Sequence, residues 1–146
     1  MTESPQEPVE QPRPTEGPVR NLTALTRKEG ATPEQFREHW LGVHGPLARR
    51  ALPHAVRYVQ NHVMSSGTRV GYPTHDYEID GIVEFVFESR EGMAEDFASP
   101  LGQELMEDAT RFIGRMRVYE VVAHVIVDRG PVDLQPADLP PSGAPS

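Results

Sequence analysis

The sequence predicts one small α+β domain, and three observations support this fold class. The chain has 146 residues, a length that suits one domain with tails. Four stretches are rich in β-branched and aromatic residues. Two others carry apolar residues at helical spacing beside helix-capping residues. The order strand, helix, strand, strand, helix, strand predicts a four-stranded antiparallel sheet with both helices on one face, the ferredoxin-like βαββαβ arrangement.

Composition excludes several classes of protein. The net charge is −8 and the cationic residues are scattered, so we expect no nucleic-acid partner, which would require a basic surface. The chain has no cysteine, which excludes disulfides and thiolate chemistry. The N-terminus is acidic and polar, and no apolar run approaches the length of a membrane span. We therefore expect a cytoplasmic protein without a membrane partner.

The two ends of the chain differ in composition from its centre. Residues 1–19 and 129–146 hold most of the prolines and almost no large apolar side chains. Such segments cannot bury enough surface to offset the entropy that is lost on ordering. We expect disordered proline-rich tails at both ends and a folded domain at residues 20–128.

The first half of the domain contains a predicted strand at residues 21–27 and a predicted helix that begins at Pro33. Thr32 suits the N-cap of this helix, and Gln35 completes a Thr-x-x-Gln capping box. Four apolar residues at helical spacing then predict its buried face: Phe36, Trp40, Val43 and Leu47.

The two middle strands are predicted at residues 55–63 and 77–89. The second of them alternates between an apolar and a mixed face, and we expect the apolar face to pack against the helices. The apolar face carries Ile79, Val83, Phe85 and Phe87. The mixed face carries Asp80, Ile82, Glu84 and Val86.

The second helical region is predicted at residues 90–113, with an interruption at Ser99, which can cap a new segment. The inward residues of that segment are predicted to be Leu101, Leu105 and Phe112. A last strand is predicted at residues 117–128. Its apolar face carries Tyr119, Val121, Ala123 and Val125, and its mixed face carries Val118, Glu120, Val122, His124 and Ile126.

The mixed strand faces have no predicted cover within one chain. They combine Asp80, Glu84, Glu120 and His124 with large aliphatic side chains, and such a surface does not remain in water. A second copy that closes the two sheets into a dimeric α+β barrel is the economical solution, so we predict a homodimer. Each subunit would then enclose a cavity of apolar groups with a few acids and a histidine, which is typical of a small-molecule site.

His44 is the first candidate for chemistry. Pro46 cannot donate a hydrogen bond to the carbonyl of Gly42 and disfavours helical geometry at Gly45, so we expect the helix to kink or end beside this imidazole. An imidazole at the margin of the buried face can reach a cavity and titrate near neutrality. The alternative is a helix-terminal histidine that interacts with the helix dipole.

The remaining histidines in the centre of the chain are weaker candidates. His39 lies about 140° from His44 on an ideal helix of 3.6 residues per turn, so the two are not expected to form a metal pair. We assign structural roles to His54 and His62, and His75 lies on a loop of unknown reach. The spacing of histidines and carboxylates matches no metal-binding signature, and we expect neither a metal nor another cofactor.

Asp80 and Glu84 are candidate partners for a histidine because they share one face of a predicted strand. A buried carboxylate has a raised pKa unless it is paired, and such a group can move protons. The alternative is that both acids form cross-strand ion pairs, with Arg57 or Arg117 as partners.

The chain resembles the EthD-like family of dimeric α+β-barrel proteins. The resemblance rests on "TPEQFREHWLGVHGPLARRALPHAVRYVQNHV", "YEIDGIVEFVFES" and "SPLGQELMEDATRFI", which together span most of residues 21–128. The family helix has the form Phe-x-x-x-Trp followed by His-x-Pro-Leu, and the matching residues are Phe36, Trp40, His44, Pro46 and Leu47. The acidic position before the final Phe of the second helix is matched by Asp108 and Phe112.

The resemblance, which extends to methylmuconolactone isomerases and polyketide dehydratase-like proteins, implies a cofactor-independent lyase or isomerase. It implies that His44 acts as general base or acid and that Tyr58 hydrogen-bonds a substrate oxygen. It also implies that Asp80 or Glu84 orients the reacting groups or relays a proton. The expected substrate contacts are Trp40, His75 and His124. The cysteine position of the isomerases holds Phe85 here, which argues against the same lactone isomerisation.

We therefore predict proton transfer on an apolar, oxygenated small molecule such as a polyketide or aromatic intermediate. Dehydration, cyclisation, isomerisation and decarboxylation all remain open at this point. Two alternatives also remain. One is a cofactor-free oxygenase on the same barrel, and the other is a non-catalytic binding protein for a pathway intermediate.

Overall fold

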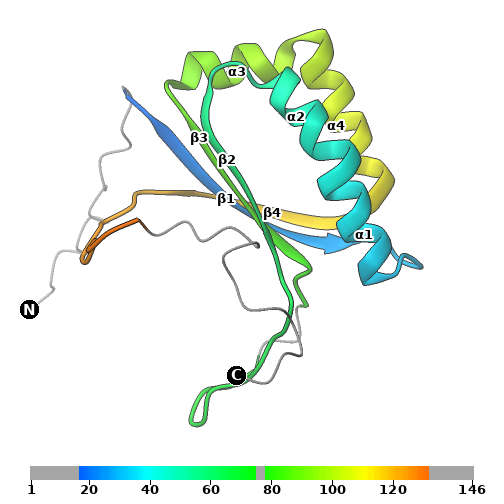
Figure 1. Cartoon of the computed structure of the whole chain (residues 1–146), viewed down its shortest axis with the longest axis vertical. Helices are drawn as coiled ribbons and strands as arrows, with labels where there is room; N and C mark the ends of the chain where they lie inside the picture. Colours follow the sequence, from blue (N-terminus) through cyan, green and yellow to red (C-terminus); the bar gives the residue numbers. More distant parts are fainter. Residues whose placement is uncertain (1–16, 75–77, 132–146) are drawn as a thin grey trace, which may run out of the picture.

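The structure is a computed structural model that describes residues 17–74 and 78–131. Its element order is the predicted βαββαβ, and each of the two helical regions consists of more than one segment (Figure 1). The elements are β1 (Val19–Arg27), α1 (Pro33–His39), η1 (Trp40–His44), α2 (Gly45–Ala51), β2 (Ala55–His62), β3 (Gly81–Phe87), α3 (Arg90–Ala98), α4 (Pro100–Phe112) and β4 (Ile113–Val121).

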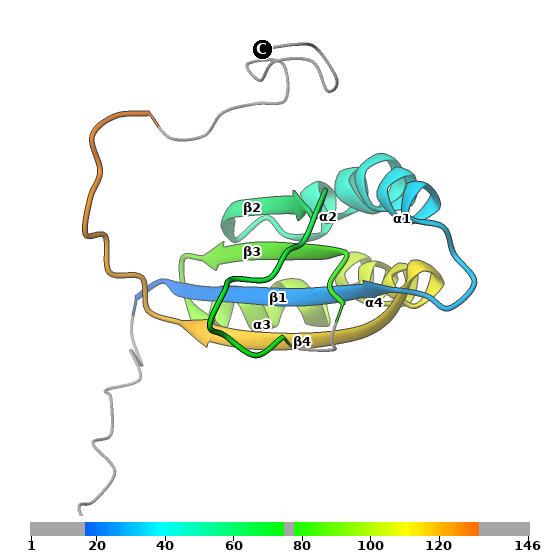
Figure 2. The ribbon, with the colours of Figure 1, turned by 90° about the horizontal axis from the view of Figure 1, so that it is seen from below.

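The strands form one antiparallel sheet in the order β2-β3-β1-β4. Figures 1 and 2 show all described helices on the same face of this sheet, and no described helix covers the other face. This is the ferredoxin-like α+β arrangement that the sequence predicts. Within the described ranges no helix is long and apolar enough to cross a bilayer. The predicted tails lie almost wholly outside the described residues.

The first helix begins as the sequence predicts. Thr32 accepts a hydrogen bond from the backbone of Gln35 at 3.1 Å, and the Gln35 side chain accepts one from the backbone of Thr32 at 2.9 Å. This reciprocal capping box satisfies two of the backbone groups that a helix start leaves unpaired. Phe36 and Trp40 then pack with Leu25 of β1 in one of the two core clusters.

The sequence predicts that the helix kinks or ends beside Pro46. The helix does not end there, because a π-helical turn accommodates the proline. In η1 the Gly45 N–H donates to the carbonyl of Trp40, five residues back. The wider turn holds one extra residue, so α1, η1 and α2 run on without a break to Ala51. The extra residue also shifts the buried stripe, because Val43 is 51% exposed while His44 is buried.

Ser99 separates the two segments of the second helical region, as the sequence predicts. Its hydroxyl accepts a hydrogen bond from the backbone of Gly102 at 3.0 Å and donates one to the carbonyl of Asp96 at 2.6 Å. Leu105 and Phe112 are buried as expected, but Leu101 is 36% exposed and does not point inward.

The last strand differs from the prediction in extent and in orientation. It spans Ile113–Val121 and follows α4 without a loop, instead of spanning residues 117–128. Thr23 pairs with both Val83 and Val118, so Val118 shares the helix-facing side of the sheet with Val83. Tyr119 and Val121 therefore lie on the other side, the reverse of our prediction. The pattern "RVYEVVAHVIVD" is apolar on both faces, so alternation alone could not fix the orientation.

Candidate active site

A cavity of about 280 Å³ lies between the helices and the helix-facing side of the sheet. Its mouth lies between α4 and the edge strand β4, where Met106, Met116 and Val118 are 48%, 44% and 56% exposed. Most of its wall is apolar, which is typical of a small-molecule pocket. The polar residues on the wall are Asn21, Thr23, His44 and Tyr58, together with the indole of Trp40.

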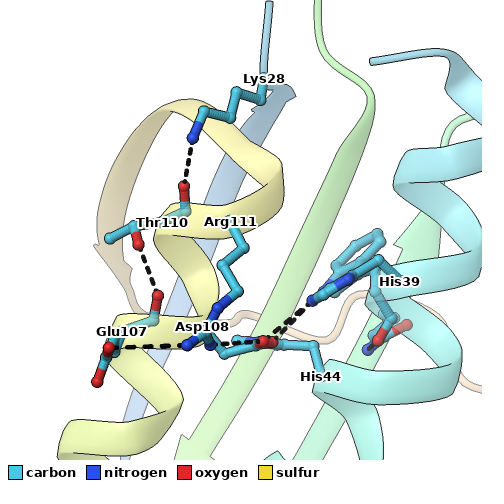
Figure 3. A network of polar contacts seen from close by, with 9 residues as sticks. Lys28, His39, His44, Glu107, Asp108, Thr110 and Arg111 are labelled. Carbon is cyan, nitrogen blue, oxygen red and sulfur yellow. Dashed lines mark hydrogen bonds and ion pairs between the residues drawn. The ribbon is translucent and has the colours of Figure 1, made fainter.

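His44 and Asp108 form a buried pair at this cavity. The Nδ1 atom of His44 lies 2.9 Å from Oδ2 of Asp108, and the two residues are 7% and 3% exposed. His44 comes from η1 and Asp108 from α4, so the pair joins the two helical regions that lie side by side on the sheet (Figure 3). The ring of Phe112 packs edge-on against the imidazole, with the centroids 4.9 Å apart.

Two further cationic or imidazole groups hold the same carboxylate. The Nε2 atom of His39 lies 3.0 and 3.1 Å from the two oxygens of Asp108, and Nη1 of Arg111 donates to Oδ1 at 3.2 Å. Figure 3 shows Asp108 in the middle of this group. The extra residue of the π turn brings His39 and His44 to the same side of the helix, which corrects the 140° separation expected for an ideal α-helix.

The hydrogen bonds determine which nitrogen of His44 is free to react. An ionised carboxylate can only accept, so Nδ1 of His44 donates to Asp108 and Nε2 of the neutral ring carries a lone pair. Among the described residues no group hydrogen-bonds to this Nε2, and every fully enclosed side-chain nitrogen or oxygen has a partner. Nε2 is therefore open to the cavity, where it can accept a proton.

The surroundings of His44 favour its neutral form. Burial lowers the pKa of His44 below its ordinary value of 6.5, and the hydrogen bond and charge of Asp108 offset this only in part. For Asp108, burial by itself would raise the pKa, but hydrogen bonds from His44 and His39 outweigh it and the net pKa is lowered. The pair at neutral pH is thus a free imidazole base held by a carboxylate.

Tyr58 and Gln60 of β2 form a second polar group on the helix-facing side. Nε2 of Gln60 donates to the Tyr58 hydroxyl at 3.0 Å and to the π-turn carbonyl of Trp40 at 2.7 Å. Nε2 of His62 donates to Oε1 of the same amide at 2.9 Å. Burial raises the pKa of Tyr58 above 10.0, so the hydroxyl keeps its proton and can donate it to a substrate oxygen.

The structure does not bring Asp80 and Glu84 to His44. Glu84 lies on the opposite side of the sheet from the cavity, and Asp80, which precedes β3, is held by the backbone and side chain of Arg27 at the end of β1. Glu84 accepts from Arg57 at 2.7 Å and also pairs with Arg20, and Asp80 accepts from Nη1 of Arg27 at 2.6 Å. Burial by itself would raise the pKa of Glu84, but the arginines outweigh it and lower the pKa. The predicted relay through these acids is replaced by the pair with Asp108.

The remaining predicted site residues are placed as follows. Trp40 is 1% exposed and its ring forms part of the cavity wall, whereas His124 is exposed and follows the end of β4. His75 lies outside the described residues. Among the residues that the structure describes, no group of three or more histidines and carboxylates is arranged to hold a metal ion.

Sequence reasoning gave Asp108 no chemical role. The available signal was its spacing, because Leu105, Asp108 and Phe112 fall on one helical face. An acid on an otherwise apolar stripe indicates a buried charge, and a buried charge needs a partner. The structure shows that the partner is His44.

Comparison with known proteins supports the fold and the family. The family model described as EthD domain matches residues 28–115, and a comparison with curated protein sequences gives no significant match.

Three solved structures illustrate the likeness. A hydroxynitrile lyase from Passiflora edulis has a TM-score of 0.58 at 13% identity, over 79% of this chain and 100% of that chain. A dimeric ferredoxin-like protein from Thermobifida fusca has a TM-score of 0.56 at 13% identity, over 74% and 92%. A cofactor-independent oxygenase from Streptomyces nogalater has a TM-score of 0.50 at 11% identity, over 76% and 99%. At these identities the likeness shows the fold.

Proposed function

Because the chain belongs to the EthD domain family, we propose that its cavity is the active site of a cofactor-independent lyase or isomerase that works by proton transfer. One observation carries the proposal. An imidazole with a lowered pKa is fixed by a buried carboxylate at 2.9 Å, and its second nitrogen opens into an apolar cavity. This is the arrangement that a general base requires.

In the proposed reaction, Nε2 of His44 removes a proton from the carbon next to a carbonyl group of the substrate. Asp108 keeps Nδ1 protonated and stabilises the imidazolium that forms. The Tyr58 hydroxyl donates a hydrogen bond to the substrate oxygen, where negative charge develops. The imidazolium then returns the proton, either to another carbon or to a leaving group.

The wall of the cavity supports an uncharged, largely apolar substrate. None of the described residues that line it is Asp, Glu, Lys or Arg, so a charged substrate would be left without a counter-charge. An oxygenated aromatic or polyketide-like molecule fits this chemistry, with Trp40 as the flat apolar contact.

The proposal can be tested by a reaction that needs only a base and a cavity. The bicyclic ketone 2-tetralone exchanges its α-hydrogens in heavy water when a base removes them, and proton NMR follows the loss of signal. We expect the protein to accelerate this exchange, and His44→Ala to lose about 10²- to 10⁴-fold of the acceleration. The exposed His124→Ala serves as the control. Exchange by His44→Ala at the wild-type rate would contradict the proposal.

A matched pair of aspartates tests the role of the carboxylate. Asp108 and Asp96 are both buried and both hydrogen-bonded to a histidine, but Asp96 pairs with His54 outside the cavity. We expect Asp108→Asn to lose most of the exchange activity, because the amide no longer fixes the tautomer of His44. Asp96→Asn should retain the activity.

A cofactor-free oxygenase is the second candidate, because the same free base beside an apolar cavity could deprotonate an electron-rich aromatic compound for reaction with dioxygen. Oxygen uptake in the presence of a polyphenol, lost in His44→Ala, would favour it. A non-catalytic binding protein is the third. It would bind its ligand equally well with His44→Ala and would show no exchange activity.

We also propose that a second copy covers the open face of the sheet. Tyr119 on that face is 48% exposed and pairs across the sheet with Leu22 of β1, so apolar side chains on this face are left in water. A closed dimer would bury these side chains and place the ion pairs of Glu84 at the interface.

A further inference from the structure

We infer that Asn21 and Thr23 of β1 form a second polar subsite, which binds a hydroxyl or carbonyl oxygen at the end of the substrate remote from His44. The subsite belongs to the cavity proposed above as an active site and so rests on that proposal. It adds a substrate class, namely elongated, uncharged molecules with oxygen atoms at two ends.

The hydroxyl of Thr23 has no partner in the protein. Thr23 is 4% exposed and lines the cavity, and among the described residues no group hydrogen-bonds to its side chain. Yet every fully enclosed side-chain nitrogen or oxygen of the described part has a partner. The hydroxyl must therefore open into the cavity. A buried hydroxyl without a partner costs stability, which is expected where a residue serves a ligand.

Asn21 adds an amide to the same wall. Its Nδ2 atom has only a weak acceptor, the thioether sulfur of Met93 at 3.6 Å, and no described group hydrogen-bonds to its Oδ1. Residues two apart on a strand share one face, and Asn21 and Thr23 both line the cavity. Together they offer donors and acceptors without charge, which match a hydroxyl or carbonyl and mismatch a carboxylate or phosphate.

Asn21 lies toward the end of the cavity remote from His44, and Thr23 lies beside it, one step closer to the base. Leu25 belongs to the cluster of Trp40 and Phe112, and the His44 ring packs on Phe112, so the base lies at the Leu25 end. Asn21 lies four residues back along β1, about 13 Å at the rise of an antiparallel strand, beside Met93 of α3. A substrate that reaches both ends is as long as two fused rings with an oxygen at each end.

Calorimetric titration with two probes tests the subsite. We use 2-naphthol, which has one hydroxyl, and 2,6-dihydroxynaphthalene, which has hydroxyls at both ends. We expect the wild-type protein to bind the diol about 2- to 10-fold more tightly, the scale of one net hydrogen bond. The double variant Asn21→Leu/Thr23→Val should bind both probes with equal affinity.

The controls are a matched asparagine and a matched threonine away from the cavity. Asn61 and Thr26 each donate to a backbone carbonyl outside it, so Asn61→Leu and Thr26→Val should keep the preference for the diol. Equal affinities in the wild-type protein, no binding of either probe, or a preference that survives in the double variant would each overturn the inference. A retained preference without 2-tetralone exchange would overturn the proposed function and leave the subsite standing.

Thermal unfolding gives a test without any ligand. Because Val removes an unpaired hydroxyl and keeps the shape of the side chain, Thr23→Val should melt at the same temperature as the wild-type protein or a few degrees higher. A clear drop in melting temperature would mean that the hydroxyl has a structural partner, and would overturn its assignment to the subsite.

Discussion

His44 and His54 each pair with a buried aspartate, yet their surroundings move the pKa in opposite directions. Burial lowers the pKa of His44 in spite of Asp108. For His54, the hydrogen bond that its Nδ1 donates to Asp96 at 2.7 Å raises the pKa, helped by the charges of Glu95 and Glu88. His44 is 7% exposed and the side chain of His54 is 34% exposed. Burial, more than the identity of the partner, therefore decides which histidine is a free base near neutrality.

This contrast predicts two opposite pH dependences of stability. The unfolded chain takes up a proton at His44 near pH 6.5, above the lowered folded pKa, so His44 makes the protein lose stability as the pH falls below 6.5. At His54 the folded pKa is the higher one, so its contribution is complete below pH 6.5 and disappears as the pH rises through the raised pKa.

Urea unfolding of His44→Gln and His54→Gln between pH 5 and 8.5 measures both effects. Relative to the wild-type protein, His44→Gln should gain stability as the pH falls below 6.5. His54→Gln should be less stable than the wild-type protein below pH 6.5, and this difference should shrink as the pH rises above 6.5. Difference curves of the same sign would show that the two imidazoles do not have opposite environments.

Part of the site could be predicted from single residues, and part could not. His44, Tyr58 and Trp40 were selected from the sequence, and the structure places all three on one cavity. Asp80 and Glu84 were selected from strand alternation, which identifies the face of a strand but not which face the helices cover. The role of Asp108 could not be predicted, because it depends on which residue of α4 packs against η1. Local sequence does not show which residues of the two helical regions come into contact.

At the scale of elements, the π turn explains how a Gly-Pro pair can lie inside a helix. Pro46 removes one backbone donor, and in the π turn the Gly45 N–H donates to the Trp40 carbonyl instead. The same carbonyl accepts a second hydrogen bond from Nε2 of Gln60 in β2 at 2.7 Å. Capping residues and helical spacing predicted where the helix begins, since these are local features. The π turn depends on a contact with a strand, so spacing on an ideal helix could not predict it.

Substitution by alanine should change stability in opposite directions at two glycines, Gly42 in the π turn and Gly81 in β3. A Cβ atom at Gly42 would meet no other atom within 4 Å, so Gly42→Ala should raise the free energy of unfolding by about 0.5–1 kcal/mol through helix propensity. At Gly81 a Cβ atom would lie 2.4 Å from the Trp40 ring, and Gly81→Ala should lower it by about 1–3 kcal/mol.

Urea unfolding, followed by the fluorescence of the single tryptophan, measures both changes. Because Gly81→Ala also pushes Trp40 toward the cavity, it should weaken binding of 2-naphthol, whereas Gly42→Ala should not. Equal effects of the two substitutions on stability would contradict the packing of Trp40 against β3.

At the scale of the whole molecule, the sheet has helices on one face and an open face with a mixed character. The open face carries the ion pairs of Glu84 with Arg20 and Arg57 next to apolar groups such as Tyr119 and Leu22, which are paired across β4 and β1. The sequence also predicts a second subunit, although it assigns the two faces of the last strand the wrong way round. The prediction is the same because both faces of that strand are apolar. The number of exposed apolar groups, more than their exact placement, therefore supports a second subunit.

Sedimentation velocity at micromolar concentration tests this assembly with one pair of variants. We expect a dimer for the wild-type protein and a monomer for Tyr119→Glu, because the interface would then have to desolvate a carboxylate in place of an aromatic ring. Leu41→Glu is the matched control, since Leu41 is 66% exposed on the π turn, away from the open face. A monomeric wild-type protein, or dimers in both variants, would show that the open face is not the interface.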